Sequence, residues 1–311
     1  MTVAITDRKL MMAPLARWSC RVALFSASLL AVGIVLHHFT SFPTPVAINL
    51  FLVCLAFSVL AALLGIVALA QIWQRGHGGA VTAAVGILLP LLVWAWPLTF
   101  VPAFLRLPAI NDITTDVTNP PRFMALAKQR PGDANPIAYP GERFAKEQQA
   151  AYPDLRTFTS DRSAEETFEV VEEVVRKLKW RVVSSDAPAG GRAPKGGTLE
   201  ATDQTLIIGF VDDIVVRVEG GPTQARVDVR SASRYGVGDL GQNAIRVRRF
   251  LTELYTRLDA GVPIAGRKRR PSAAALKRLK ERDPQRAESR TTPGSARPDA
   301  QRGRGQKETQ R

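Results

Sequence analysis

The chain has 311 residues, enough for one or two ordinary domains, and carries a formal net charge of +14, from 42 Lys or Arg against 28 Asp or Glu. Both cysteines and all three histidines lie before residue 110. The C-terminal region therefore cannot contain a thiol nucleophile, a Ser-His-Asp triad, a disulfide or a thiolate or imidazole zinc site, and we expect neither a cofactor nor a metal.

The positive charge is concentrated at the C-terminal end. Residues 261–311 contain 15 Lys or Arg against 5 Asp or Glu, a net of +10, which leaves only +4 for the rest of the chain. The high charge thus gives no reason to expect a nucleic-acid partner for the folded part. This segment has almost no large apolar residues and is predicted to be a disordered basic tail. It either contacts anionic lipid or cell-wall polymers or is a dispensable extension.

Three apolar runs follow one another near the N-terminus, at about 22–39, 46–73 and 80–105. Each reaches the roughly 18–20 residues that a helix needs to cross a hydrocarbon core of about 30 Å. Lipid offers no partner to an unpaired backbone amide, so each run is expected to be helical. Residues 22–106 are therefore predicted to form a three-helix transmembrane region, with the lipid bilayer as the first partner of the chain.

Short-loop charges predict the orientation of these spans. Four cations lie before the first span and Arg75 lies between the second and third, whereas the loop 38–45 contains no Lys or Arg. The positive-inside rule then places residues 1–21 in the cytoplasm and everything after the third span in the periplasm. A cleaved signal peptide is the alternative interpretation of the first run, but no small-residue cleavage site follows it, so an uncleaved span is favoured.

Residues 107–162 are predicted to be an extended, proline-rich segment that wraps the outer domain. Asn119 precedes two prolines and should be extended, and no clear periodicity follows up to Ser160. Five aromatic residues are spread along the segment and would pin it to the domain surface: Phe123, Tyr139, Phe144, Tyr152 and Phe158.

Residues 163–260 are predicted to form the α+β core of the outer domain. Ser163 and Glu166 make a capping box, and apolar residues from Phe168 to Leu178 then fall on one helical face. Four strand-like runs follow, at 180–184, 198–202, 206–219 and 224–233, and a second amphipathic helix spans 240–258. The predicted order is α-β-β-β-β-α: a four-stranded antiparallel sheet with one apolar face covered by two helices and one charged face.

The glycine-rich stretch 228–251 is where a polar site is most plausible, because it joins the last strand to the last helix. Even spacing puts Arg230 and Arg234 on one strand face and Ser231 on the other, while Asp239 is placed to cap the helix. A functional interpretation is a site for a carboxylate, phosphate or sugar group held by Arg230, Arg234, Asn243 and Arg246. The alternative, which is favoured, is an internal ion network, for instance Arg230 with Asp213 or Asp228, that closes the sheet against the helix.

Three further carboxylates are candidate site residues. Asp213 follows Asp212 at an expected strand break, and such a pair serves acid–base chemistry or binds a hard cation. Adjacent strand residues point to opposite faces, however, which favours a turn or a cross-strand salt bridge. Asp112 and Asp116 flank two threonines and could bind Ca²⁺, although capping of a turn suits this spacing better.

These motifs resemble a bacterial family of proteins of unknown function, DUF family 1499. The resemblance rests on Asp112-Ile-Thr-Thr-Asp116 with Asn119-Pro-Pro121, and on Phe210-Val-Asp-Asp213 leading into Val215-Val-Arg217. Above all it rests on Asp228-Val-Arg-Ser-Ala-Ser-Arg234 with the glycines, Asn243 and Arg246 that follow. It covers roughly residues 110–258. An apolar membrane region often precedes the domain in this family, and the family implies no particular activity.

The leading hypothesis is a non-enzymatic protein of the bacterial inner membrane, whose periplasmic domain binds a ligand, an anionic lipid or a membrane-protein partner. The alternative is an envelope hydrolase or transferase that works with Asp and Arg side chains alone. Such an enzyme needs a solvent-reachable carboxylate with a perturbed pKa, whereas in a binding module every carboxylate can be paired. A purely structural scaffold is the third hypothesis.

Overall fold

The computed structural model describes residues 12–188 and 196–259. The basic tail predicted at 261–311 and the first half of the N-terminal segment, residues 1–11, lie outside the described residues.

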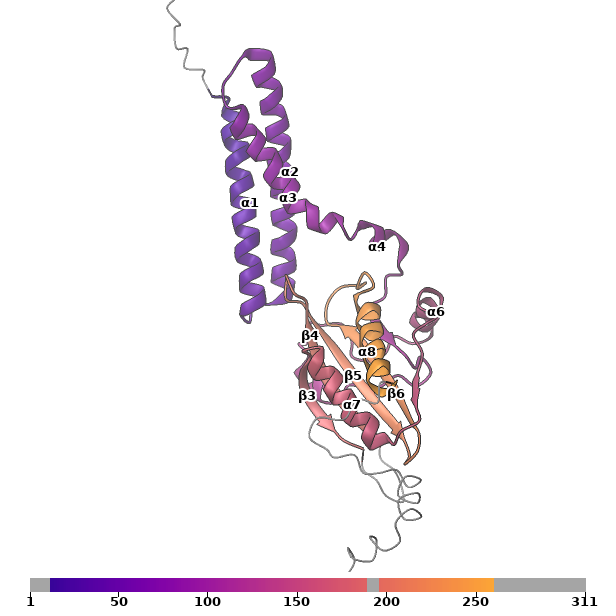
Figure 1. Cartoon of the computed structure of the whole chain (residues 1–311). Helices are drawn as coiled ribbons and strands as arrows, with labels where there is room; N and C mark the ends of the chain where they lie inside the picture. Colours follow the sequence, from indigo (N-terminus) through magenta and orange to yellow (C-terminus); the bar gives the residue numbers. More distant parts are fainter. Residues whose placement is uncertain (1–11, 189–195, 260–311) are drawn as a thin grey trace, which may run out of the picture. The chain divides into compact units, whose positions relative to one another are not determined.

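The N-terminal region consists of helices α1 (Pro14–Phe39), α2 (Thr44–Arg75) and α3 (Ala80–Leu98), followed by the short α4 (Val101–Arg106) (Figure 1). The first three are long and apolar enough to cross a membrane. Small residues allow them to pack closely: a Cβ added at Gly86 would lie 1.8 Å from Oγ of Ser19. Ser19 and Ser26 of α1 also donate hydrogen bonds to backbone carbonyls of α2, so the three helices form one bundle.

The C-terminal region contains an antiparallel sheet of six strands, not the four predicted from the sequence. The predicted strands are β3 (Arg181–Asp186), β4 (Gly197–Gln204), β5 (Val211–Gly220) and β6 (Ala225–Ser233). The two additional strands, β1 (Asp112–Thr114) and β2 (Phe158–Ser160), both pair with β6 along its otherwise open edge. A strand of three residues is too short to show a periodic pattern, so neither strand could be predicted from the sequence.

One side of the sheet, which we call the helix face, is covered by α7 (Ala164–Lys177) and α8 (Gln242–Asp259) (Figure 1). The expected capping interaction is present, since Oγ of Ser163 accepts from the amide of Glu166 at 3.1 Å. The core between helices and sheet is fully buried and includes these side chains: Phe168, Val174, Ile214, Val216, Val229, Phe250 and Leu254. Trp180 stacks on Phe250 at the edge of this core.

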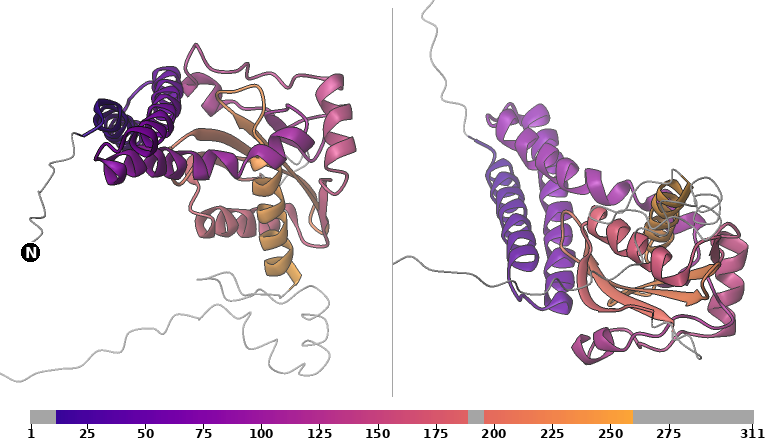
Figure 2. Two further views of the ribbon diagram at one scale, coloured as in Figure 1. Left: turned by 90° about the horizontal axis from the view of Figure 1, so that it is seen from above. Right: turned by 60° about the horizontal axis from the view of Figure 1, so that its bottom comes forward.

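The opposite side of the sheet is covered by residues 115–140, which we call the strap (Figure 2). The strap contains the short helix α5 (Ala125–Gln129), and α6 (Glu142–Ala151) follows it. Phe123 and Leu126 of the strap form a buried cluster with Val215 and Ala232 of the sheet. Polar side chains on this second face are therefore also shielded from water, and they need partners.

Candidate functional site

Arg230 of β6 points from the sheet into the strap and is paired with Asp112 of β1. Its Nε and Nη2 donate to the two carboxylate oxygens of Asp112 at 2.9 and 2.7 Å. Two more donations reach the carbonyls of Pro121 and Ile137, so four of the five guanidinium N–H groups are used. Burial raises the pKa of Asp112, and the guanidinium of Arg230 opposes that rise.

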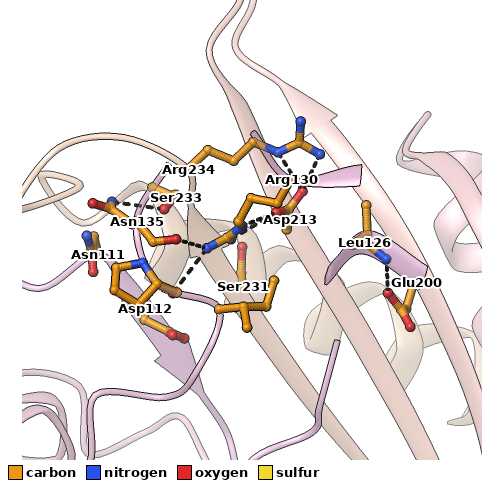
Figure 3. Close-up of polar contacts among 12 residues, drawn as sticks. Asn111, Asp112, Leu126, Arg130, Asn135, Glu200, Asp213, Ser231, Ser233 and Arg234 are labelled. Carbon is orange, nitrogen blue, oxygen red and sulfur yellow. Dashed lines mark hydrogen bonds and ion pairs between the residues drawn. The ribbon is translucent and has the colours of Figure 1, made fainter. Parts of the chain in front are cut away.

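Asp213 of β5 lies between two arginines on the same face (Figure 3). Its side chain is fully buried, and its oxygens accept from Arg130 of the strap at 2.9 Å and from Arg234 at 2.7 Å. Arg130 also donates to the carbonyl of Asn135, and the amide of Asn135 donates to the carbonyl of Arg234. Asp213 thus joins the strap to the end of β6.

Asp116 and Asp228 share Arg217 of β5, whose Nη2 donates to them at 3.1 and 2.9 Å. The other oxygen of Asp116 accepts from the amides of Thr118 and Asn119, which shapes the turn before the two prolines. Asp116 therefore caps a turn, as its spacing favoured. Among residues 12–188 and 196–259 there is no group of three or more acidic, His or Cys side chains that could hold a metal ion.

A second polar cluster lies on the helix face, at the point where α8 crosses β6. Arg246 donates to Asp212 at 2.6 Å, to Asp203 at 2.7 Å and to Asn243 at 2.6 Å. Ser231 donates to Asn243 at 2.7 Å. Burial raises the pKa of Asp212, and the guanidinium of Arg246 counteracts it, so this cluster holds α8 against the sheet with charged groups inside the domain.

Asp239 occupies the amide-lined N-terminus of α8 with its own carboxylate. Its two oxygens accept from the amides of Gly241 and Asn243, both at 2.8 Å. Burial raises the pKa of Asp239, and these two hydrogen bonds counteract it. The position at which an external anion would bind a helix N-terminus is therefore filled by this side chain.

The four residues proposed to hold one ligand lie on both faces of the sheet. Arg230 and Arg234 point into the strap, whereas Asn243 and Arg246 lie against the helix face. The arrangement corresponds to the alternative interpretation, an internal ion network, although its partners differ: Arg230 pairs with Asp112, and Asp213 pairs with Arg130 and Arg234.

Glu200 of β4 caps a helix beside the candidate site, a role that the sequence pattern did not predict. It is 1% exposed, and its oxygens accept from the amides of Met124, Ala125 and Leu126 at 2.7 to 2.9 Å, so it caps α5 from a different element (Figure 3). The signal in the sequence was a single glutamate between two apolar residues of a predicted strand, Leu199 and Ala201.

Beside Glu200, between the strap and strands β3 to β5, lies an open cavity of about 560 Å³. Three cationic side chains line it: Arg122, Lys128 and Arg217. Arg122 and Lys128 are exposed and make no hydrogen bond or ion pair with the described residues. Further lining comes from these residues: Asn119, Pro120, Pro121, Met124, Ser184, Asp186, Thr198 and Glu200.

The six strands, the strap and the buried arginine–carboxylate pairs all belong to one continuous region of the chain. Residues 112–254 match the family described as "Protein of unknown function (DUF1499)". The resemblance noted in the sequence is thus confirmed for the sheet domain. No curated protein and no solved structure gives a match in the corresponding comparisons.

Part of the cavity wall in the sheet domain is formed by residues that carry the resemblance to this family. Asn119, Pro120 and Pro121 form one wall and Arg217 lies in another, and these are among the residues that carry the resemblance. The turn that presents the prolines is held by Asp116, and Asp116 is held by Arg217. The buried network therefore shapes the wall of the cavity without itself being open to a ligand.

Proposed function

We propose that this chain is a non-catalytic binding protein of the bacterial inner membrane, whose periplasmic DUF1499 domain binds an anionic envelope ligand in the strap cavity. The observation that carries the proposal is a pair of cations, Arg122 and Lys128, that line the cavity and have no partner among the described residues. Buried arginines elsewhere in the domain form ion pairs with carboxylates of the domain itself. Arg122 and Lys128 can instead bind a carboxylate or phosphate of a ligand.

Arg217 lies at the inner wall of the cavity, but its charge is already paired with Asp116 and Asp228. Its Nε is buried without a hydrogen-bond partner among the described residues and lies 3.6 Å from a carboxylate oxygen of Glu219. Arg122 and Lys128, which are exposed, are therefore the cations that a ligand in the cavity can reach. The carboxylate of Glu200 on the same wall already accepts from three backbone amides, so it does not pair with Arg122 or Lys128.

The location follows from the charges that flank α1 to α3. Arg17 and Arg21 lie in the first turns of α1 and Arg75 ends α2, whereas the connection between α1 and α2 has no Lys or Arg. The positive-inside rule supports a cytoplasmic N-terminus and a periplasmic domain.

The engaged carboxylates favour binding over hydrolysis or group transfer. Asp112, Asp213 and Asp116 each hold an arginine and are buried or nearly so, with exposed side-chain fractions of 5%, 0% and 14%. General acid–base catalysis needs a carboxyl group that can reach the substrate and exchange its proton. None of these three is in that position.

The test is phosphate-dependent stability of the full chain in detergent, with inorganic phosphate as the probe. Unfolding by urea is followed by the fluorescence of Trp180, the one tryptophan in the sheet domain, after the other four are replaced by phenylalanine. We expect phosphate at roughly ten times its dissociation constant to raise the free energy of unfolding by about 1.4 kcal/mol. The double variant Arg122→Ala/Lys128→Ala should lose this increment.

A matched control separates specific binding from the general stabilising effect of phosphate on proteins. Arg143→Ala/Lys146→Ala also removes two cations, from the exposed pairs of α6, and should keep the increment. An equal rise in all three chains would show that phosphate acts only as a bulk salt and would refute the proposal.

A further inference from the structure

The turn between β4 and β5 exposes apolar side chains where polar residues are usual. Leu206 is 90% exposed and Ile207 46% exposed. Single exposed leucines are common on protein surfaces, but two adjacent aliphatic residues at the tip of a turn are not, since turns favour Gly, Asn, Asp and Ser. The tip has a surface suited to an apolar environment.

This turn is ordered by its own hydrogen bonds. The hydroxyl of Thr205 accepts from the amides of Gly209 and Phe210 at 3.1 and 2.8 Å, and the amide of Thr205 donates to the carbonyl of Phe210 at 2.9 Å. These bonds close the base of the turn, whereas the amides of residues 206–208 make no hydrogen bond with the described residues. The tip therefore suits the interfacial layer, where water and lipid headgroups can accept from these amides, and not the hydrocarbon core.

The strand register shows at which end of the sheet the turn lies. Asp112 pairs with Ala232 and Asp213 also pairs with Ala232, so β1 and β5 begin at the same end of the sheet. We call this the near end, because the chain reaches β1 there directly from α4. The β4–β5 turn precedes Val211, the first residue of β5, and therefore projects from the near end.

A third exposed apolar residue lies at the near end. Val237 is 79% exposed and belongs to the connection between β6, which finishes at this end, and α8. The connection is held to the incoming chain by two hydrogen bonds: the side-chain amide of Asn111 donates to the carbonyl of Gly236 at 2.7 Å, and the backbone amide of Asp239 donates to the carbonyl of Ile110 at 3.1 Å. The β5–β6 turn at the far end, 221–224, contains no large apolar residue.

The tether between α4, which follows α3 after two residues, and the near end is short. Helix α4 finishes at Arg106 and β1 starts at Asp112, so residues 107–111 connect α4 to the sheet. An extended chain spans at most about 3.6 Å per residue, which limits this connection to about 20 Å. In addition, Nδ1 of His37, in the last turn of α1, lies 2.7 Å from the carbonyl oxygen of Ile208 in the turn.

We propose that Leu206, Ile207 and Val237 insert into the interfacial layer of the membrane in which α1 to α3 are anchored. The near end of the sheet then rests on the bilayer, and the strap cavity, whose walls include the first residues of β4 and the last residues of β3, is turned towards the periplasm. The inference rests on the membrane anchoring within the proposed function. The ligand of the cavity would be presented away from the lipid surface.

Site-directed fluorescence of the full chain in phospholipid vesicles tests the proposal. Cys20 and Cys54 are replaced by serine, and a single cysteine at Leu206 carries an environment-sensitive nitrobenzoxadiazole label. We expect a lipid with a spin label just below its headgroup to quench this label at least threefold more strongly than the same label at Thr223. Thr223 is an exposed residue of the far-end turn and serves as the matched control.

A label at Leu60, in the middle of α2, distinguishes failure of the inference from failure of the anchoring. If Leu60 is quenched by a spin label deep in the acyl chains while Leu206 behaves like Thr223, the chain is anchored and the insertion of the turn is refuted. If Leu60 is not quenched, the anchoring fails and the insertion fails with it.

Discussion

Replacing Asp213 by alanine is expected to lower the free energy of unfolding of the sheet domain by about 3–5 kcal/mol. The carboxylate is fully buried, and its removal leaves Arg130 and Arg234 facing each other without a counter-charge. Removing one partner from a buried ion pair costs more than the pair contributes, because a desolvated charge remains. Urea unfolding of the Trp180 reporter chain measures the loss.

Asp154→Ala is the matched control for Asp213. Asp154 pairs with Arg248 through side chains that are 52% and 40% exposed. Solvent screens such a pair, so its loss should cost about 0–1 kcal/mol. If the two substitutions had similar effects, Asp213 would not hold the strap to the sheet as the geometry indicates.

Replacing Arg246 by methionine is expected to cost a similar amount, about 3–5 kcal/mol. The substitution preserves much of the side-chain volume but leaves Asp212, with 7% of its side chain exposed, without its cation. The double variant Asp212→Asn/Arg246→Met should be more stable than the single one, with a coupling of about 1–3 kcal/mol, because no buried charge is left unpaired. A double variant whose losses simply add would contradict this role.

The pH dependence of the Arg246→Met variant gives an independent check. Burial already raises the pKa of Asp212, and Arg246 is the main group that opposes the rise, so the folded-state pKa is higher still in the variant. A group whose pKa is raised on folding binds its proton more tightly in the folded state, and its stabilising contribution is lost as pH rises through that pKa. The difference in the free energy of unfolding between the wild type and the Arg246→Met variant should therefore shrink as pH falls from neutral towards about 4.

Much of the domain plan could be predicted from local patterns. Three apolar runs predicted three apolar helices, and the box at Ser163 and Glu166 predicted where α7 begins. Errors arose where local pattern and tertiary pairing disagree. Leu206 to Ile208 look like the start of a strand, but Thr205 closes them into a turn and β5 begins only at Val211.

The partners in the polar network could not be predicted, because they are far apart in the sequence. Arg230 and Asp112 are separated by 118 residues, and they meet because β1 pairs with β6. A strand of only three residues has too little pattern for this pairing to be predicted from the sequence. Alternation did place Arg230 and Ser231 on opposite faces. The cavity depends on the strap folding over the sheet, so Arg122 and Lys128 carried no local signal.

The most direct test of the account is a native mass spectrum of the full chain, extracted gently from its own membranes. We expect an anionic adduct on the wild-type chain and on Arg143→Ala/Lys146→Ala, and none on Arg122→Ala/Lys128→Ala. An adduct retained by the Arg122→Ala/Lys128→Ala variant, or a wild-type chain that carries none, would contradict a binding function for the strap cavity.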